Sequence, residues 1–310
     1  MKGGAKFADP LVTATGETRA WVDLTALKTL WFNTGTLCNL ACENCYIESK
    51  PTNDRLVYLS LDEVVAYLDE IKADGLPTEE IGITGGEPFM NPDIIPIIEE
   101  SLKRGFKVLV LTNAMRPMMK CADALLRLKD TYGEAMVIRV SVDHFKQELH
   151  EEERGKRSWE PMMKGLQWLS DNEFNIDIAG RTRWGEDEAE LRTGFDEFFK
   201  AHNIEIDAYD QKQLMLFPEM DEDAPVPEIT DACWGVLGVH PDDMMCASSR
   251  MVVKRKEDDR PSVMACTLLA YDQQFNLGES LKDASKSVRL NHPHCAKFCV
   301  LGGGACSVND

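Results

Sequence analysis

The chain has 310 residues, 44% hydrophobic and 28% charged, which is the mixture of a soluble globular protein and excludes a disordered or membrane-embedded class. Its 34 basic and 53 acidic residues give a net charge of -19, which argues against nucleic acid and membrane surfaces as partners. Residues 1–20 contain no apolar run of the length that a secretory signal needs, so we expect a cytoplasmic protein with reduced thiols.

The region from residue 28 to 217 alternates short apolar runs with longer stretches of helical period. This pattern predicts βα units around a parallel sheet, and hence an α/β fold. We expect strands at 29–33, 80–83, 107–111, 136–142, 175–179 and 205–209. We expect helices at 60–75, where Ser60 and Glu63 form a capping box, at 92–105 with Pro92 in the first position, and at 117–129, 158–170 and 188–200.

The sequence after residue 217 differs in composition. Residues 218–232 are acidic and rich in proline, which is typical of a linker. Residues 233–310 contain six cysteines and few strong helices, so a metal would help to stabilise them. We therefore expect an N-terminal extension (1–27), an α/β core (28–217), the linker and a cysteine-rich tail.

Ten cysteines is a high number for a cytoplasmic chain, in which clustered thiols more often bind metal than form disulfides. Cys38, Cys42 and Cys45 follow the first expected strand with the spacing C-x3-C-x2-C. Three thiolates leave one iron of a four-iron cluster without a protein ligand, which suits chemistry at the metal. Structural zinc sites normally have four ligands, and no fourth cysteine or histidine lies nearby. Cys121 stands alone on an expected helix, where we expect a buried thiol.

Polar motifs follow the next strands. Gly85, Gly86, Glu87 and Pro88 come directly after the second strand, where two glycines let the backbone approach a ligand and a carboxylate can accept a hydrogen bond from an ammonium group. The later strand ends carry further polar residues: Thr112, Asn113, Ser141 and Asp143. Parallel barrels build their active sites at the C-terminal ends of strands, so these residues can share one site.

The cysteine triplet followed by Tyr46, together with the GGEP segment, resembles the radical S-adenosylmethionine (radical SAM) superfamily over residues 28–210. The resemblance implies a partial (β/α)6 TIM-like barrel. It implies a 4Fe-4S cluster on the three cysteines, whose open iron binds the amino and carboxylate groups of SAM, and reductive cleavage of SAM to a 5′-deoxyadenosyl radical. The cofactor-binding residues implied by the resemblance are Tyr46, Gly85, Gly86, Glu87, Pro88, Asn113, Ser141 and Arg154.

The tail carries a second resemblance. Cys246 followed by Ala-Ser-Ser-Arg, then Cys266, then the Phe-Asn-Leu-Gly segment 275–278 and a closing cysteine group resemble the SPASM and twitch auxiliary-cluster extensions. Full SPASM regions have seven cysteines for two clusters, whereas this tail has six. The resemblance therefore implies one auxiliary iron-sulfur cluster, with Cys246, Cys266, Cys295 and Cys299 as the best ligands and Cys306 next. Zinc remains an alternative, while His292 and His294 are expected to lie outside the ligand set.

These features predict a radical SAM oxidoreductase or maturase that abstracts hydrogen from a peptide or small-molecule substrate, with oxidation assisted by the auxiliary cluster. A flavodoxin- or ferredoxin-type protein would supply electrons. The alternatives are a non-catalytic iron-sulfur electron carrier or sensor, which would not need the GGEP segment, and a zinc-stabilised scaffold. About 27 residues precede the first strand, too few for a leader-binding domain, so a peptide substrate would need a separate recognition protein or none.

Overall fold

The computed structural model describes residues 5–219 and 225–303, and within them a nine-stranded sheet has the order β10-β9-β8-β2-β3-β4-β5-β6-β7. Neighbouring strands from β8 to β7 are parallel, and β9 and β10 add an antiparallel edge. The strands of this sheet are β2 (Thr29–Asn33), β3 (Glu80–Thr84), β4 (Lys107–Thr112), β5 (Met136–Ser141), β6 (Asn175–Arg181), β7 (Leu214–Phe217), β8 (Ser249–Val253), β9 (Ser262–Met264) and β10 (Asn276–Gly278). The fold is therefore mixed α/β with a parallel sheet, as expected.

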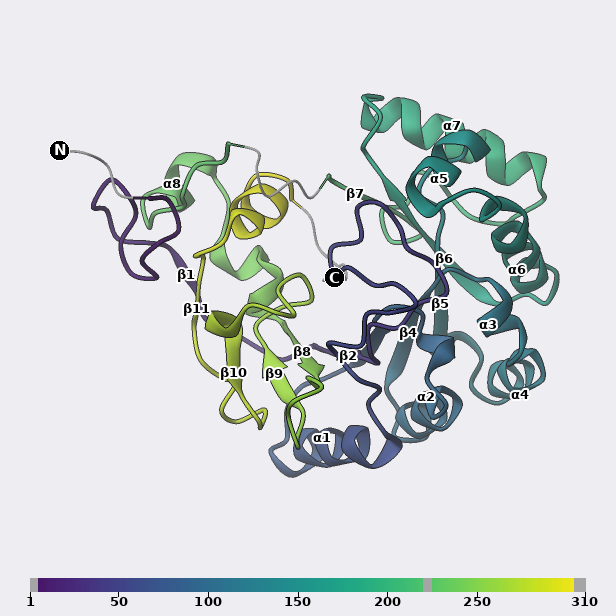
Figure 1. Ribbon diagram of the computed structural model, residues 1–310, viewed down its shortest axis with the longest axis horizontal. Coiled ribbons are helices and arrows are strands. Elements are labelled where there is room, and N and C mark those ends of the chain that lie inside the picture. The colour runs from purple at the N-terminus through teal and green to yellow at the C-terminus, as the bar shows by residue number, and fades with distance from the viewer. Residues whose placement is uncertain (1–4, 220–224, 304–310) are drawn as a thin grey trace.

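Seven helices lie along the outer side of the curved sheet, and the loop that follows β2 lies on its inner side (Figure 1). They are α1 (Leu61–Ala73), α2 (Ile94–Lys103), α3 (Arg116–Met119), α4 (Ala122–Tyr132), α5 (Gln147–Arg154), α6 (Trp159–Asp171) and α7 (Glu188–Ala201). A further short helix, α8 (Cys233–Leu237), lies beside the N-terminal segment, away from this sheet. The side chains of β2 are all buried because the sheet is covered on both faces. None of the helices in the described part of the chain is long and apolar enough to cross a membrane.

Most expected helices form, with two corrections. The Ser60–Glu63 capping box of α1 is confirmed. Pro92 does not occupy the first position of α2, because Asn91 Oδ1 accepts the Asp93 N–H in a turn and the helix begins at Ile94. The helix expected at 117–129 is divided into α3 and α4. Cys121 lies between them and is only partly buried.

The sixth strand of the expected core was misplaced. Residues 205–207 are irregular and residues 208–209 form a turn; the sixth parallel strand is instead β7, which begins at Leu214. Arg192 explains the difference, since its Nη1 donates to the carbonyl of Ala208 at 2.6 Å and so satisfies backbone that a strand would have paired. Asp207 Oδ1 also accepts the Tyr209 N–H at 2.9 Å, which favours a turn.

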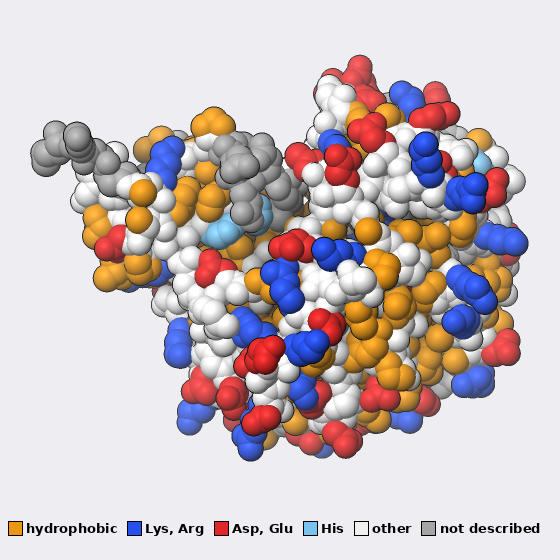
Figure 2. All heavy atoms as spheres, in the orientation of Figure 1, with side chains coloured by type: hydrophobic (Ala, Val, Ile, Leu, Met, Phe, Trp, Pro, Cys, Tyr) orange, Lys and Arg blue, Asp and Glu red, His pale blue; other side chains and the backbone are white. Residues whose placement is uncertain are grey.

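The tail extends the central sheet. Strand β8 pairs in parallel with β2 from Thr29 opposite Ser249 to Phe32 opposite Val252. A small second sheet joins β1 (Trp21–Val22) to β11 (Val288–Arg289), and so links the N-terminal segment to the tail. On the face shown in Figure 2, acidic and basic side chains are interspersed, so the negative net charge forms no single acidic patch there.

Candidate functional site

A cavity of about 160 Å³ lies at the C-terminal ends of the parallel strands. Its lining comes from the loops after β2 and β3, from the ends of β4 to β7, and from two tail residues. These residues are Cys38, Cys42, Asn44, Cys45, Tyr46, Ile47, Ser49, Thr84, Gly85, Gly86, Leu111, Thr112, Asn113, Ser141, Asp143, Arg154, Ala179, Gly180, Arg181, Phe217, Pro218, Leu268 and Phe298. The cysteine triplet and most of the expected cofactor-binding residues therefore face one space.

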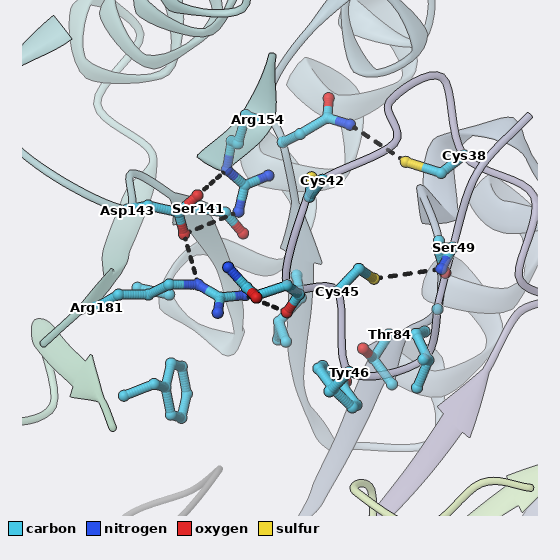
Figure 3. A pocket seen from close by; sticks show the side chains of 18 of the residues that line it. Cys38, Cys42, Cys45, Tyr46, Ser49, Thr84, Ser141, Asp143, Arg154 and Arg181 are labelled. Carbon is cyan, nitrogen blue, oxygen red and sulfur yellow. Dashed lines mark hydrogen bonds and ion pairs between the residues drawn. The ribbon is translucent and has the colours of Figure 1, made fainter. Parts of the chain in front are cut away.

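The three cysteines of the β2 loop all line this cavity (Figure 3). Backbone N–H groups point at two of the sulfurs, from Leu40 to Cys38 at 3.4 Å and from Ser49 to Cys45 at 3.3 Å. Burial raises the pKa of Cys38 to about 12 and also raises the pKa of Cys42. Such thiols stay protonated at neutral pH unless a metal or another cation stabilises the thiolate.

The two glycines after β3 allow this loop to pack against the cysteine loop. Gly86 N donates to Gly35 O at 2.8 Å, and a Cβ on Gly86 would lie 2.3 Å from Leu37 O. Gly85 has a φ of +140°, and a Cβ there would lie 2.6 Å from Gly35 O. The glycines are therefore needed first for backbone packing that positions both loops.

Glu87 and Pro88 do not line the cavity. The Glu87 side chain accepts hydrogen bonds from Thr112 Oγ1 at 2.8 Å, from Asn113 N at 2.9 Å and from Phe89 N at 3.2 Å. Burial raises its pKa to about 6, against the lowering effect of these bonds. In this arrangement Glu87 holds the loop after β4 in place, and Asn113 of that loop faces the cavity.

A buried carboxylate lies between two arginines on the opposite wall (Figure 3). Asp143 accepts from Arg154 Nε at 2.5 Å and from Arg181 Nε at 3.3 Å. Burial alone would raise the pKa of Asp143, but the two guanidinium groups lower it below its ordinary value. Ser141, Asp143 and Arg154 come together as expected at the end of β5, whereas Arg181 was missed. Extending the expected strand 175–179 by two residues would have placed it at a strand end.

A second buried carboxylate fixes the cysteine loop. The side chain of Glu153, at the end of α5, is fully buried and accepts from Asn44 N at 3.0 Å and from Asn44 Nδ2 at 2.9 Å. The same carboxylate accepts from Arg183 Nη1 at 2.5 Å and lies 3.7 Å from Arg181 Nη2, and the backbone carbonyl of Glu153 accepts the Glu43 N–H at 2.9 Å. Because Asn44 lies between Cys42 and Cys45, this clamp determines where those two sulfurs lie.

The tail forms a second, smaller cavity of about 20 Å³. Four of the five expected tail ligands line it, namely Cys246, Cys266, Cys295 and Cys299, together with apolar side chains such as Phe275. Burial raises the pKa of Cys246 to about 11 and that of Cys295 well above its usual value. Cys306 lies outside the described residues. His292 and His294 do not line this cavity, and burial lowers the pKa of His294 to about 4.

A fully buried arginine lies beside this second cavity. Arg250 donates to the carbonyls of Cys246 at 2.6 Å, Ser249 at 2.8 Å, Ala284 at 2.9 Å and Lys286 at 3.1 Å. Burial lowers its pKa, and Cys246 and Cys266 would raise it when they are ionised, as they are in a metal-bound state.

The tail also contacts the first cysteine loop. Tyr271 Oη donates to Ile47 O at 2.7 Å and accepts from Asn53 Nδ2 at 3.2 Å, and the Arg55 guanidinium lies 3.7 Å from the centre of the Tyr271 ring. Phe298, in the π-helix Cys295–Val300, stacks on Phe217 at a centroid distance of 6.0 Å. The two cavities are therefore built on connected elements.

Across residues 5–219 and 225–303, no three His, Cys, Asp or Glu side chains are arranged to hold a single metal ion. In an iron-sulfur cluster each thiolate binds its own iron, so its cysteines need not converge on one point.

The chain belongs to the radical SAM superfamily, because the family model described as Radical SAM superfamily matches residues 32–188, about half of the chain. Members of this superfamily are enzymes that use a 4Fe-4S cluster and SAM. Among proteins with similar sequences, the antilisterial bacteriocin subtilosin biosynthesis protein AlbA of Bacillus subtilis (strain 168) is 33% identical over 143 residues. That match covers 46% of this chain and 30% of AlbA.

Solved structures show the same fold at low sequence identity. SuiB of Streptococcus suis bound to SAM has a TM-score of 0.59 and 12% identity, covering 82% of this chain and 63% of that chain. SuiB bound to the precursor peptide SuiA has a TM-score of 0.51 and 17% identity, covering 64% of this chain and 40% of that chain. The matches to AlbA and SuiB thus span less than two thirds of those proteins.

Proposed function

We propose that this protein is a radical SAM maturase that abstracts hydrogen from a peptide substrate. The observation that carries the proposal is the single cavity shared by Cys38, Cys42 and Cys45 and by the polar ends of β4 and β5. An electron carrier would need only the cysteines. A substrate-sized space lined by Asn113 and Ser141 has a purpose in an enzyme.

The side chains that line the first cavity are of the types that bind a 4Fe-4S cluster and SAM. Cys38, Cys42 and Cys45 would hold the 4Fe-4S cluster. Tyr46, Gly85, Gly86, Asn113, Ser141 and Arg154 would contact SAM. When bound, this pair supplies a 5′-deoxyadenosyl radical by reductive cleavage of SAM. We propose an indirect role for Glu87, since both of its oxygens already hold the β4 loop that carries Asn113. Pro88 is part of the proposed SAM-binding GGEP segment, although its side chain does not line the cavity.

We also propose that the tail holds one auxiliary, twitch-like cluster. The buried Arg250 supports this, because an uncompensated buried charge is costly and the thiolates of Cys246 and Cys266 would neutralise it. The second cavity has the volume of about one water molecule, so the four cysteine side chains would have to turn outward around a cluster. A net oxidation of the substrate needs an acceptor for a second electron, and we propose that this cluster assists there.

The peptide substrate is proposed from relatives. AlbA is a bacteriocin biosynthesis protein, and SuiB has been solved with a precursor peptide. A small-molecule substrate is the second possibility raised by the sequence. The proposal includes four further points. We propose a partial barrel, a linker at residues 218–232 between the core and the tail, a cytoplasmic location, and a flavodoxin- or ferredoxin-type protein as the reductant.

The triple variant Cys38→Ala, Cys42→Ala, Cys45→Ala tests both metal assignments. We expect anaerobically prepared variant protein to form no 5′-deoxyadenosine from SAM and dithionite, yet to retain iron and a visible iron-sulfur absorption from the tail. Loss of all iron would contradict the auxiliary cluster. Normal 5′-deoxyadenosine formation would contradict the proposed enzyme. Wild-type protein processed in parallel is the control for reconstitution.

A further inference from the structure

One part of the first cavity is not claimed by the residues proposed for SAM. Arg181, at the end of β6, Phe217 at the end of β7, and the tail residues Leu268 and Phe298 line it. Arg181 and Phe217 lie on the two strands at the end of the sheet opposite β9 and β10, separated from β3 and its GGEP loop by β4 and β5. This side of the cavity is available to a substrate.

Arg181 presents an open donor edge in this region. Its Nε donates to Asp143, and its Nη2 donates to Asn44 O at 3.2 Å and lies 3.7 Å from Glu153. Within the described residues Nη1 has no such partner. Two of the five guanidinium N–H groups therefore donate to the protein and Nη2 also forms an ion pair with Glu153, while the two hydrogens on Nη1 remain for an oxygen acceptor. Asp143 is shared with Arg154, so it does not fully neutralise Arg181.

The other walls of this region are apolar. Phe217 and Phe298 stack with an interplanar angle of 21°, and Leu268 and Ala179 also line the cavity. Phe298 is almost fully buried. A ligand that contacts both walls must have an oxygen acceptor next to an apolar or aromatic group.

We propose that this region is the substrate subsite, and that it binds an aromatic or large aliphatic amino-acid residue through its carboxyl or carbonyl oxygen on Arg181 Nη1. The side chain of that residue packs against Phe217 and Phe298. The subsite rests on the proposed function, because it assigns the rest of the cavity to SAM. The same oxygen chemistry is offered by the free carboxylate of a C-terminal residue and by the backbone amide of an internal residue.

Two simple probes test the subsite with the anaerobic, SAM-loaded full chain. N-acetyl-L-phenylalanine carries the carboxylate, and N-acetyl-L-phenylalaninamide carries only amide carbonyls. Binding is measured by calorimetric titration, and SAM cleavage is measured separately as 5′-deoxyadenosine formed with dithionite. We expect the wild type to bind at least one probe. Equal binding of both indicates an internal residue, and binding of the acid alone indicates a C-terminal one.

The variants separate substrate contact from cofactor contact. Arg181→Gln should weaken binding of the preferred probe at least tenfold, and should weaken SAM binding, measured in the same titration without probe, by a much smaller factor. Arg181→Lys keeps a charge beside Asp143, should fold normally, and should also weaken the probe, since lysine lacks the planar donor edge. Phe217→Leu should weaken the phenylalanine probe more than N-acetylglycine. Arg127→Gln, on exposed α4, controls for net charge.

Unchanged probe affinity in both Arg181 variants would overturn the subsite, as would failure of the wild type to bind either probe. Loss of SAM binding in Arg181→Lys would assign this residue to the cofactor instead. If the wild-type protein does not cleave SAM, the proposed function is wrong. The subsite is judged separately, by whether the probes bind.

Discussion

Replacing Glu153 by glutamine should loosen the first cysteine loop, since the clamp depends on both carboxylate oxygens. The amide nitrogen of glutamine cannot accept, so it loses the Asn44 Nδ2 bond and the bond from Arg183. The first costs about 1 kcal/mol, and the second, to a charged donor, costs about 2 kcal/mol. We take a low value for the loss of the Arg183 bond because Arg183 keeps its ion pairs with Glu43 and Glu152, whose side chains are largely exposed.

The expected destabilisation is therefore about 3 kcal/mol, which is about a hundredfold in the unfolding equilibrium. Anaerobic urea unfolding measures the free energy, and iron analysis measures cluster content, which should fall because Asn44 lies between Cys42 and Cys45. Glu152→Gln is the matched control, since its side chain is 48% exposed and should contribute less than about 0.5 kcal/mol. If Glu153→Gln matches this control in stability and iron, Glu153 does not position the loop.

Glu87 should make stability depend on pH. Burial raises its pKa from 4.5 to about 6, so its protonated form favours folding, and that contribution is lost as the pH rises from about 4.5 to about 6. The stability of wild type relative to Glu87→Gln should fall by about 2 kcal/mol over this range, and a flat difference would contradict the shift. Tyr271→Phe removes the bonds to Ile47 O and Asn53, so it should cost about 1 to 2 kcal/mol in urea unfolding. Tyr209→Phe is the control, since this tyrosine is 57% exposed and its change should alter the free energy of unfolding little. An equal loss of stability in both variants would show that the Tyr271 hydrogen bonds do not stabilise the cysteine loop.

The sequence predicted correctly those strands and helices that are determined by neighbouring residues in the chain. Five of the six expected strands lie within two residues of their positions, because each is an apolar run bounded by turn residues. The Ser60–Glu63 capping box located α1 for the same reason. The expected strand at 205–209 failed because Arg192, on the preceding helix α7, binds its backbone, and the apolar pattern of the segment itself does not reveal that contact.

The candidate site was partly readable from sequence. The cysteine spacing, the strand-end rule and the family resemblance found residues that do share a cavity, including Asn113 at a strand end and Arg154 by resemblance. The same rule does not show which way a side chain turns, so it placed Glu87 toward the ligand rather than toward Thr112. Phe298 and Tyr271 could not be predicted from the sequence. Phe298 reaches the cavity, and Tyr271 the cysteine loop, only through tertiary packing.

The parallel pairing of β8 with β2 has a consequence for how the protein is made. Thr29 and its partner Ser249 are about 220 residues apart, which corresponds to on the order of 10 to 40 s of translation. During that interval the nascent chain exposes one edge of an apolar strand that carries the cysteine loop. We expect this edge to stay unpaired until β8, in about the last fifth of the chain, has emerged from the ribosome, and to be a site that chaperones can cover in the meantime.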